Sequence, residues 1–108
     1  MAKFRIVIKN TGEVPVTNLE IIDAYDEAFD PRFTDPGREI LPDGRFKWRI
    51  PRLEKGERRE FNVQCTCVKP SLSACSRVVV TADGDLNYAD EKCVEIQPAA
   101  PSAGIDGR

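Results

Sequence analysis

The four cysteines carry the most reactive side chains of this sequence. Cys65, Cys67, Cys75 and Cys93 form an even set in a short chain, which favours disulfides and an oxidising compartment. A zinc site is the rival interpretation, but structural zinc sites use two close pairs of ligands, and here only Cys65 and Cys67 are close. Free buried thiols are the third interpretation.

The spacing of the cysteines limits how they can pair. Cys65 and Cys67 share one face of an expected strand, so they are poorly placed to bond to each other. We predict the disulfides Cys67–Cys75 and Cys65–Cys93, because Cys67 and Cys75 flank one expected loop. The alternative is Cys65–Cys75 with Cys67–Cys93. A redox or intermolecular role is the functional alternative to a structural cross-link.

The chain contains no histidine. Histidine is the usual general base near neutral pH and a common metal ligand. Neither a Ser-His-Asp nor a Cys-His arrangement can therefore be assembled from these residues. We expect no enzyme activity, no catalytic residue and no cofactor.

Acidic side chains gather in two stretches where the strand pattern breaks. The members are Asp23, Asp26, Glu27, Asp30 and Asp35 in the first stretch, and Asp83, Asp85, Asp90 and Glu91 in the second. Loops at one end of a sandwich can supply the carboxylate oxygens that Ca²⁺ prefers, but the spacing is not that of an EF-hand. We interpret these residues as solvated turn carboxylates and keep calcium as the alternative.

A basic strip begins at Arg45, Lys47 and Arg49, which point away from the expected core. Four more basic residues lie nearby: Arg52, Lys55, Arg58 and Arg59. Sixteen basic against eighteen acidic residues give a net charge of −2, without the overall positive balance of nucleic-acid-binding domains. We predict a solvated strand face, or a face that meets the acidic loops of a neighbouring copy.

Aromatic residues could serve a carbohydrate site or a core. Phe46 and Trp48 point inward by parity, so we predict that they fill the core instead of stacking on a sugar. Tyr88, in an expected loop over residues 85–90, is the better candidate for an exposed contact.

The elements that position these residues follow from hydrophobic periodicity. Phe46, Trp48 and Ile50 alternate with three basic residues, and residues 4–9 and 60–67 alternate in the same way. A period of two is typical of a strand with one buried and one solvated face. The pattern predicts an all-β fold, an immunoglobulin-like antiparallel β-sandwich of about seven strands, for which 108 residues is a suitable length.

Proline and glycine set the expected boundaries of these strands. Residues 25–38 are predicted to be a loop, with at most a helical turn at 25–29, held to the sandwich by Phe29 and Phe33. Pro51 is expected to end the third strand, and residues 69–76 to form a loop that carries Cys75. The expected strands are residues 4–9, 17–23, 45–50, 58–68, 77–82 and 91–97.

The chain divides into a sandwich module over residues 1–97 and a linker over 98–108. The linker is rich in proline and small residues and cannot bury enough surface to fold, so we expect disorder. No apolar run approaches the length of a membrane helix, and no signal peptide is visible. We therefore expect the chain to be one piece of a larger polypeptide.

Several segments, in this order, resemble a known family: Lys9-Asn10-Thr11-Gly12, Val14-Pro15-Val16-Thr17-Asn18-Leu19, Leu53-Glu54-Lys55-Gly56-Glu57 and Arg77-Val78-Val79-Val80-Thr81-Ala82. Over residues 4–97 they resemble the bacterial conserved-repeat domain called domain of unknown function 11. That family is itself similar to repeats of the chlamydial large cysteine-rich outer-membrane protein. The resemblance implies an immunoglobulin-like sandwich, often in tandem, in secreted or envelope proteins. It carries no catalytic residues. The loop over residues 25–41 and the four cysteines depart from the family pattern.

We therefore expect a non-catalytic structural or interaction module of a larger bacterial cell-envelope or surface protein, located outside the cytoplasm. The expected partners are neighbouring domains of the same polypeptide and other envelope proteins, with no nucleic acid and no membrane insertion. The isolated domain is expected to be a monomer. A ligand-binding module for a glycan or calcium, or an accessory domain of a secreted enzyme, is the alternative.

Overall fold

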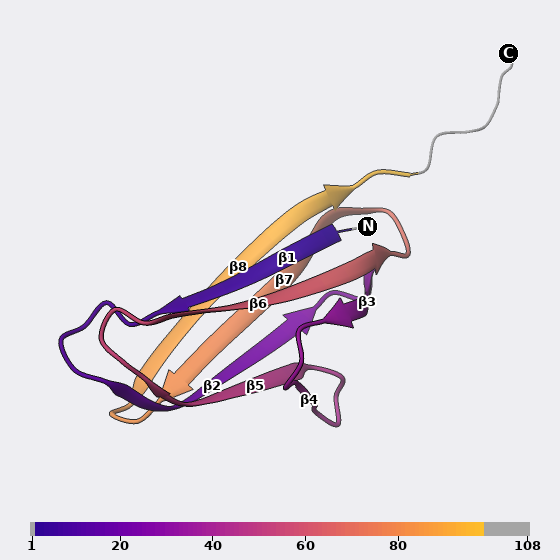
Figure 1. The fold of residues 1–108 in the computed structure, drawn as a ribbon. Coiled ribbons are helices and arrows are strands. Elements are labelled where there is room, and N and C mark those ends of the chain that lie inside the picture. The colour runs from indigo at the N-terminus through magenta and orange to yellow at the C-terminus, as the bar shows by residue number, and fades with distance from the viewer. Residues whose placement is uncertain (1, 99–108) are drawn as a thin grey trace, which may run out of the picture.

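The computed structural model describes residues 2–98 of the chain. These residues form eight antiparallel strands in two sheets. The strands are β1 (Ala2–Lys9), β2 (Val16–Tyr25), β3 (Phe29–Thr34), β4 (Glu39–Ile40), β5 (Phe46–Leu53), β6 (Arg58–Cys67), β7 (Ser71–Ala82) and β8 (Leu86–Ile96). The three-stranded sheet has the order β1-β6-β3, and the five-stranded sheet has the order β4-β5-β2-β7-β8 (Figure 1). The predicted antiparallel sandwich is confirmed, with eight strands in place of about seven.

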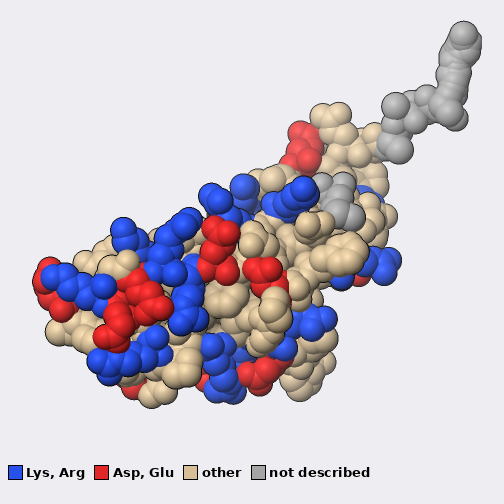
Figure 2. Space-filling model, in the orientation of Figure 1, with Lys and Arg blue, Asp and Glu red and all other residues tan. Residues whose placement is uncertain are grey.

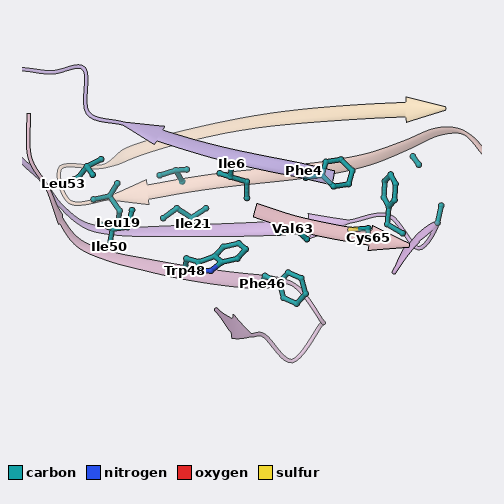
Figure 3. Close-up of a cluster of buried hydrophobic side chains, with 14 residues drawn as sticks. Phe4, Ile6, Leu19, Ile21, Phe46, Trp48, Ile50, Leu53, Val63 and Cys65 are labelled. Carbon is teal, nitrogen blue, oxygen red and sulfur yellow. The ribbon is translucent and has the colours of Figure 1, made fainter. Parts of the chain in front are cut away.

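The core lies between the two sheets, and the alternate residues of β1, β5 and β6 that the sequence pattern marked as inward supply much of it (Figure 3). Leu53 and Ala74, which were expected in loops, also belong to it. Trp48 and Ile50 are each 1% exposed, and the Trp48 ring stacks on Phe61 with 5.0 Å between ring centres. Phe4 packs edge-on against Phe29 at the other end of the core. Burial of these apolar side chains is the main contribution to stability.

Two strands pass through prolines that were expected to mark loops or strand ends. Pro51 does not end its strand, because β5 continues to Leu53 and keeps one register with β2 on both sides of Pro51. β4 reaches β5 only at Phe46 and Lys47, so among the described residues β5 has a neighbour on one side only at Pro51. Pro31 lies in β3, an edge strand whose register shifts after Pro31. Edge strands and bulges tolerate proline because the ladder there does not need its missing N–H.

The segment predicted to be a loop, residues 25–38, contains strand β3 over Phe29–Thr34 and no helical turn. Phe29 is buried as expected, but Phe33 is 63% exposed and does not hold the segment to the core. The bulge between Pro31 and Phe33 accounts for the difference, because one extra residue reverses the side on which Phe33 points.

The last two strands are longer than the sequence indicated. β7 begins at Ser71, so the loop predicted for residues 69–76 is wrong, and β8 begins at Leu86 instead of residue 91. The two strands form one long hairpin, joined by the turn Asp83-Gly84-Asp85. Gly84 and Asp85 have φ values of 82° and 59°, the left-handed conformation that such hairpin turns require.

Both ends of the described chain lie at the same end of the sandwich (Figure 1). β1 starts at the end where β8 finishes, and the turns after β1, β5 and β7 lie at the opposite end. The predicted linker lies, apart from Pro98, outside the described residues. Within residues 2–98, no helix has the length and apolar character needed to cross a membrane.

Candidate functional site

One disulfide is present, between Cys75 and Cys93, and Cys65 and Cys67 are free thiols. The predicted disulfides Cys67–Cys75 and Cys65–Cys93 are therefore wrong, as is the alternative pairing. Cys75 is not in a loop but in β7, directly opposite Cys93 of β8, with 4.0 Å between their Cα atoms.

The two cysteine pairs lie on different surfaces of the sandwich. Cys65 is fully buried, on the inner face of the three-stranded sheet. Ala74 is also fully buried, so its neighbour Cys75 points to the outer face of the five-stranded sheet. Stacked sheets are about 10 Å apart, which is too far for a disulfide between these two faces.

The disulfide also bears on the metal interpretation of the cysteines. Cys75, Glu91 and Cys93 bring their ligand atoms within 4.8 Å of one another, and no other group of three potential ligands occurs in residues 2–98. Both sulfurs are bonded to each other, and Glu91 accepts a hydrogen bond from Arg77 at 3.0 Å. The two cysteines of this group therefore form a cross-link between β7 and β8.

The acidic residues proposed as a calcium alternative do not converge. Asp26 and Asp35 accept backbone hydrogen bonds from Cys75 and Asn62, and Glu27 pairs with Lys69. Asp83 accepts from Thr17 and Asn18, which joins the turn after β7 to β2. These four carboxylates thus have separate structural partners.

Asp23 is the exception to the prediction of solvated carboxylates, because it is 2% exposed and lies on the inner face of β2. Desolvation by burial raises the pKa of this carboxyl to about 6, and the nearby Tyr25 hydroxyl opposes the shift. Burial, followed by the charge of Asp23, also raises the pKa of Tyr25. In the described structure, Oδ2 of Asp23 and the hydroxyl of Tyr25 have no hydrogen-bond partner.

The basic strip is neutralised by carboxylates within the same chain. Lys47 and Arg49 both pair with Glu20, at 3.1 and 2.9 Å, and Arg49 also pairs with Glu39. The other five residues pair as Arg45 with Asp43, Arg52 with Glu54, Lys55 with Glu13, Arg58 with Glu60 and Arg59 with Glu57. Figure 2 shows the two signs of charge interspersed over the visible face. This pattern favours a solvated face over one that attracts a polyanion.

The predictions for the aromatic residues concerned the core for Phe46 and Trp48, and the surface for Tyr88. Trp48 and Phe46 are core residues, as expected, and are not available for stacking on a sugar. Tyr88 is 64% exposed, although it lies in β8 and not in a loop. Its side chain lies on the same face as Val80, its partner on β7, which is the face turned toward the core.

A groove of about 900 Å³ lies between β1 and the inner face of the β7–β8 hairpin. The five-stranded sheet is wider than the sheet opposite it, so part of its inner face is uncovered. Eight large apolar residues are exposed in the described part of the chain, and four of them line this groove: Val7, Val14, Leu86 and Tyr88. Asp23 and Tyr25 also line it. An exposed apolar concentration of this kind is typical of an interaction site.

Sequence reasoning proposed Tyr88 as a candidate for an exposed contact but did not predict the groove that it lines. The groove depends on the relative widths of the two sheets, which no local pattern encodes. No family model, curated protein or solved structure matches the chain. The resemblance to the conserved-repeat family therefore depends on the sequence motifs alone.

Proposed function

We propose that the chain is a non-catalytic structural and interaction module of a larger bacterial envelope or surface protein, and that it works outside the cytoplasm. The Cys75–Cys93 disulfide is the observation that carries this proposal. It links two strands on the outer surface of the sandwich, where cytosolic reductants would reach it. An oxidising compartment is the setting in which such a bond persists.

The position of the chain ends supports display of the module rather than end-to-end spacing. Because β1 starts where β8 finishes, a polypeptide that continued on both sides would enter and leave at one end (Figure 1). The turns at the other end would then point away from the rest of the protein. Loops carried on a rigid scaffold are the usual place for contacts.

The free cysteines support a role without catalysis. Burial raises the pKa of the Cys65 thiol to about 12, with smaller contributions from Asp23, Cys67 and Asp30. A thiol held in its protonated form is a poor nucleophile. The chain also lacks histidine, the residue that most often activates a cysteine.

The oxidation state of the cysteines in the producing cells tests this proposal. Cells are lysed in denaturant with one alkylating reagent, the protein is reduced, and new thiols are labelled with an isotopically distinct reagent. We expect the second label on Cys75 and Cys93 and the first label on Cys65 and Cys67. Finding the first label on all four residues would place the protein in a reducing compartment and contradict the proposal.

A further inference from the structure

Among residues 2–98, one edge of β1 has no neighbouring strand. The order β1-β6-β3 places β1 at the border of the three-stranded sheet, with β6 on one side only. The pairing with β6 runs without a shift from Ala2 to Lys9, so β1 is regular over its whole length. Its other edge therefore presents a row of backbone N–H and C=O groups that another strand can use.

The unpaired edge of β1 borders the groove. Residues of β1 form one wall, and Val78 and Val80 of β7 with Leu86 and Tyr88 of β8 line the opposite side. Ile6 of β1 is one of the buried side chains between the two sheets (Figure 3). A fourth strand beside β1 would cover Leu86 and Tyr88 and extend the small sheet over the exposed inner face.

The outward face of β1 is basic and largely unpaired. Lys3, Arg5 and Lys9 are all exposed on this face. Arg5 has Glu60 at 3.6 Å, whereas Lys3 and Lys9 have no carboxylate within 4.0 Å among the described residues. The basic strip described above differs, because all seven of its members are paired. Unpaired lysines along the edge favour acidic residues on an incoming strand.

We propose that β1 binds an extended segment of another polypeptide chain, which adds as a fourth antiparallel strand to the small sheet. The segment alternates apolar residues, directed into the groove, with acidic residues, directed toward Lys3, Arg5 and Lys9. The backbone bonds supply affinity, and the alternating side chains supply specificity. This inference deepens the interaction role proposed above and rests on it, but not on the compartment.

Two other occupants fit less well. A second copy that paired its own β1 with this edge would bring Lys3, Arg5 and Lys9 against the same residues of the copy, and like charges across a strand pair are destabilising. Residues 99–108 contain one large apolar residue, Ile105, and one acidic residue, Asp106. That composition does not provide the required alternation.

A synthetic peptide tests the proposal on the full chain. The probe is a fluorescent peptide of about nine residues, long enough to span β1, in which valine alternates with glutamate. The control peptide has lysine in place of glutamate. We expect the glutamate peptide to bind about tenfold more tightly than the lysine peptide, with affinity falling as salt is raised. Binding of both peptides with equal affinity would overturn the proposal.

Two matched variants locate the site. Tyr88→Glu places a charge in the groove, and Phe33→Glu makes the same change at an equally exposed aromatic outside it. We expect Tyr88→Glu to weaken peptide binding at least about tenfold and Phe33→Glu to leave it within about twofold. Equal effects of the two substitutions would show that the peptide does not use the groove. Thermal melts of both variants confirm that each is folded.

Amide hydrogen exchange separates strand addition from loose adhesion. We expect saturating peptide to slow exchange of alternate β1 amides about tenfold or more, because their N–H groups gain acceptors. Binding without this protection would overturn the proposal. Protection of these same outer-edge amides in the free chain would also overturn it. Protection that rises with protein concentration would assign the edge to a second copy, and protection that does not would assign it to the chain's own residues. None of these measurements depends on the cysteine labelling in cells. A failure of the strand-addition proposal can therefore be distinguished from a failure of the proposed location outside the cytoplasm.

Discussion

At the scale of single residues, the two free cysteines differ in environment although they lie two positions apart. Cys65 is fully buried, whereas Cys67, at the end of β6, is partly exposed. Burial raises the pKa of Cys65 to about 12, so its reactive thiolate is scarce at neutral pH. The same strand therefore carries one protected and one accessible thiol.

Thiol labelling checks this difference. In the unreduced protein, we expect denaturant to expose two reactive thiols, because Cys75 and Cys93 are bonded. Without denaturant, we expect a maleimide to modify Cys67 and to leave Cys65 at least about a hundredfold slower. Peptide mass mapping assigns the sites. Four reactive thiols, or none, would contradict the disulfide arrangement.

Asn10 holds two connections together at the end opposite the chain termini. Its side-chain amide donates to the backbone oxygens of Val14 and Leu53, at 2.8 and 3.0 Å, and its oxygen accepts from the N–H of Gly12. Its own N–H and C=O bond to Glu57 and Gly56. Asn10 is 5% exposed, so these bonds are shielded from water.

Replacing Asn10 with alanine removes the donor to one buried carbonyl group, that of Leu53, and to one partly buried carbonyl group, that of Val14. We expect Asn10→Ala to lower the free energy of unfolding by about 2–3 kcal/mol, measured by urea denaturation. Asn87→Ala, at an exposed position of β8, is the matched control and should change stability by less than about 0.5 kcal/mol. Equal effects at the two positions would contradict a structural role for the Asn10 side chain.

At the scale of secondary-structure elements, β8 depends on few side-chain contacts. Every residue from Leu86 to Cys93 is exposed, and only Val94 and Ile96 pack partly against the core. The strand is held mainly by its backbone ladder with β7 and by the Cys75–Cys93 disulfide. A strand without a buried face is a low-stability element.

Reduction of the disulfide should therefore loosen β8 before the rest of the sandwich. The bond closes a segment with a sequence separation of 18, for which loop-closure entropy predicts a loss of about 3 kcal/mol. We expect a reductant to speed amide exchange in β8 more than in β2 or β6. The double variant Cys75→Ser/Cys93→Ser should behave like the reduced protein and show no further response. Uniform acceleration in all strands would contradict this view.

The same elements show how far sequence reasoning reaches. Alternation located β1, β5 and β6 because each buries one face, and this period of two is a local property. The first half of β8 was missed because neither of its faces is covered, so it has no hydrophobic pattern. Pro31, Pro51 and Pro70 suggested chain breaks, but two of them lie within strands: Pro31 at the bulge of an edge strand, and Pro51 where, among residues 2–98, β5 has a neighbour on one side only. The disulfide prediction failed for the same reason: placing Cys75 in a loop hid its partner across the hairpin.

At the scale of the whole molecule, the sandwich contains a buried carboxyl that no neighbour neutralises. Asp23 lies in β2 between Phe46 of β5 and Val78 of β7, its partners in the two ladders. Its position in the first acidic stretch suggested a turn, and only the register of the sheet shows that it faces the core. Burial raises its pKa from 3.8 to about 6.

The raised pKa makes folding depend on pH in a defined direction. Below about pH 4, Asp23 is protonated in both the folded and unfolded chain and contributes no pH dependence. Between about pH 4 and 6 the unfolded chain loses this proton while the folded chain keeps it, so the free energy of unfolding falls as pH rises. Above about pH 6 the full cost, about 3 kcal/mol, is present.

Asp23→Asn removes this titration and tests it. We expect the variant to gain about 3 kcal/mol relative to the parent protein between pH 4 and pH 8, measured by urea denaturation at each pH. The difference between the two pH values cancels any constant effect of the amide on packing. Asp43→Asn is the control, because the Arg45 N–H lowers the pKa of that carboxyl, so its linkage to folding lies below about pH 4 and the variant should show no comparable change between pH 4 and pH 8. If Asp23→Asn has the same effect on the free energy of unfolding at pH 4 and at pH 8, Asp23 is ionised in the folded protein. A charged or hydrogen-bond-donating group in the groove would then stabilise the carboxylate.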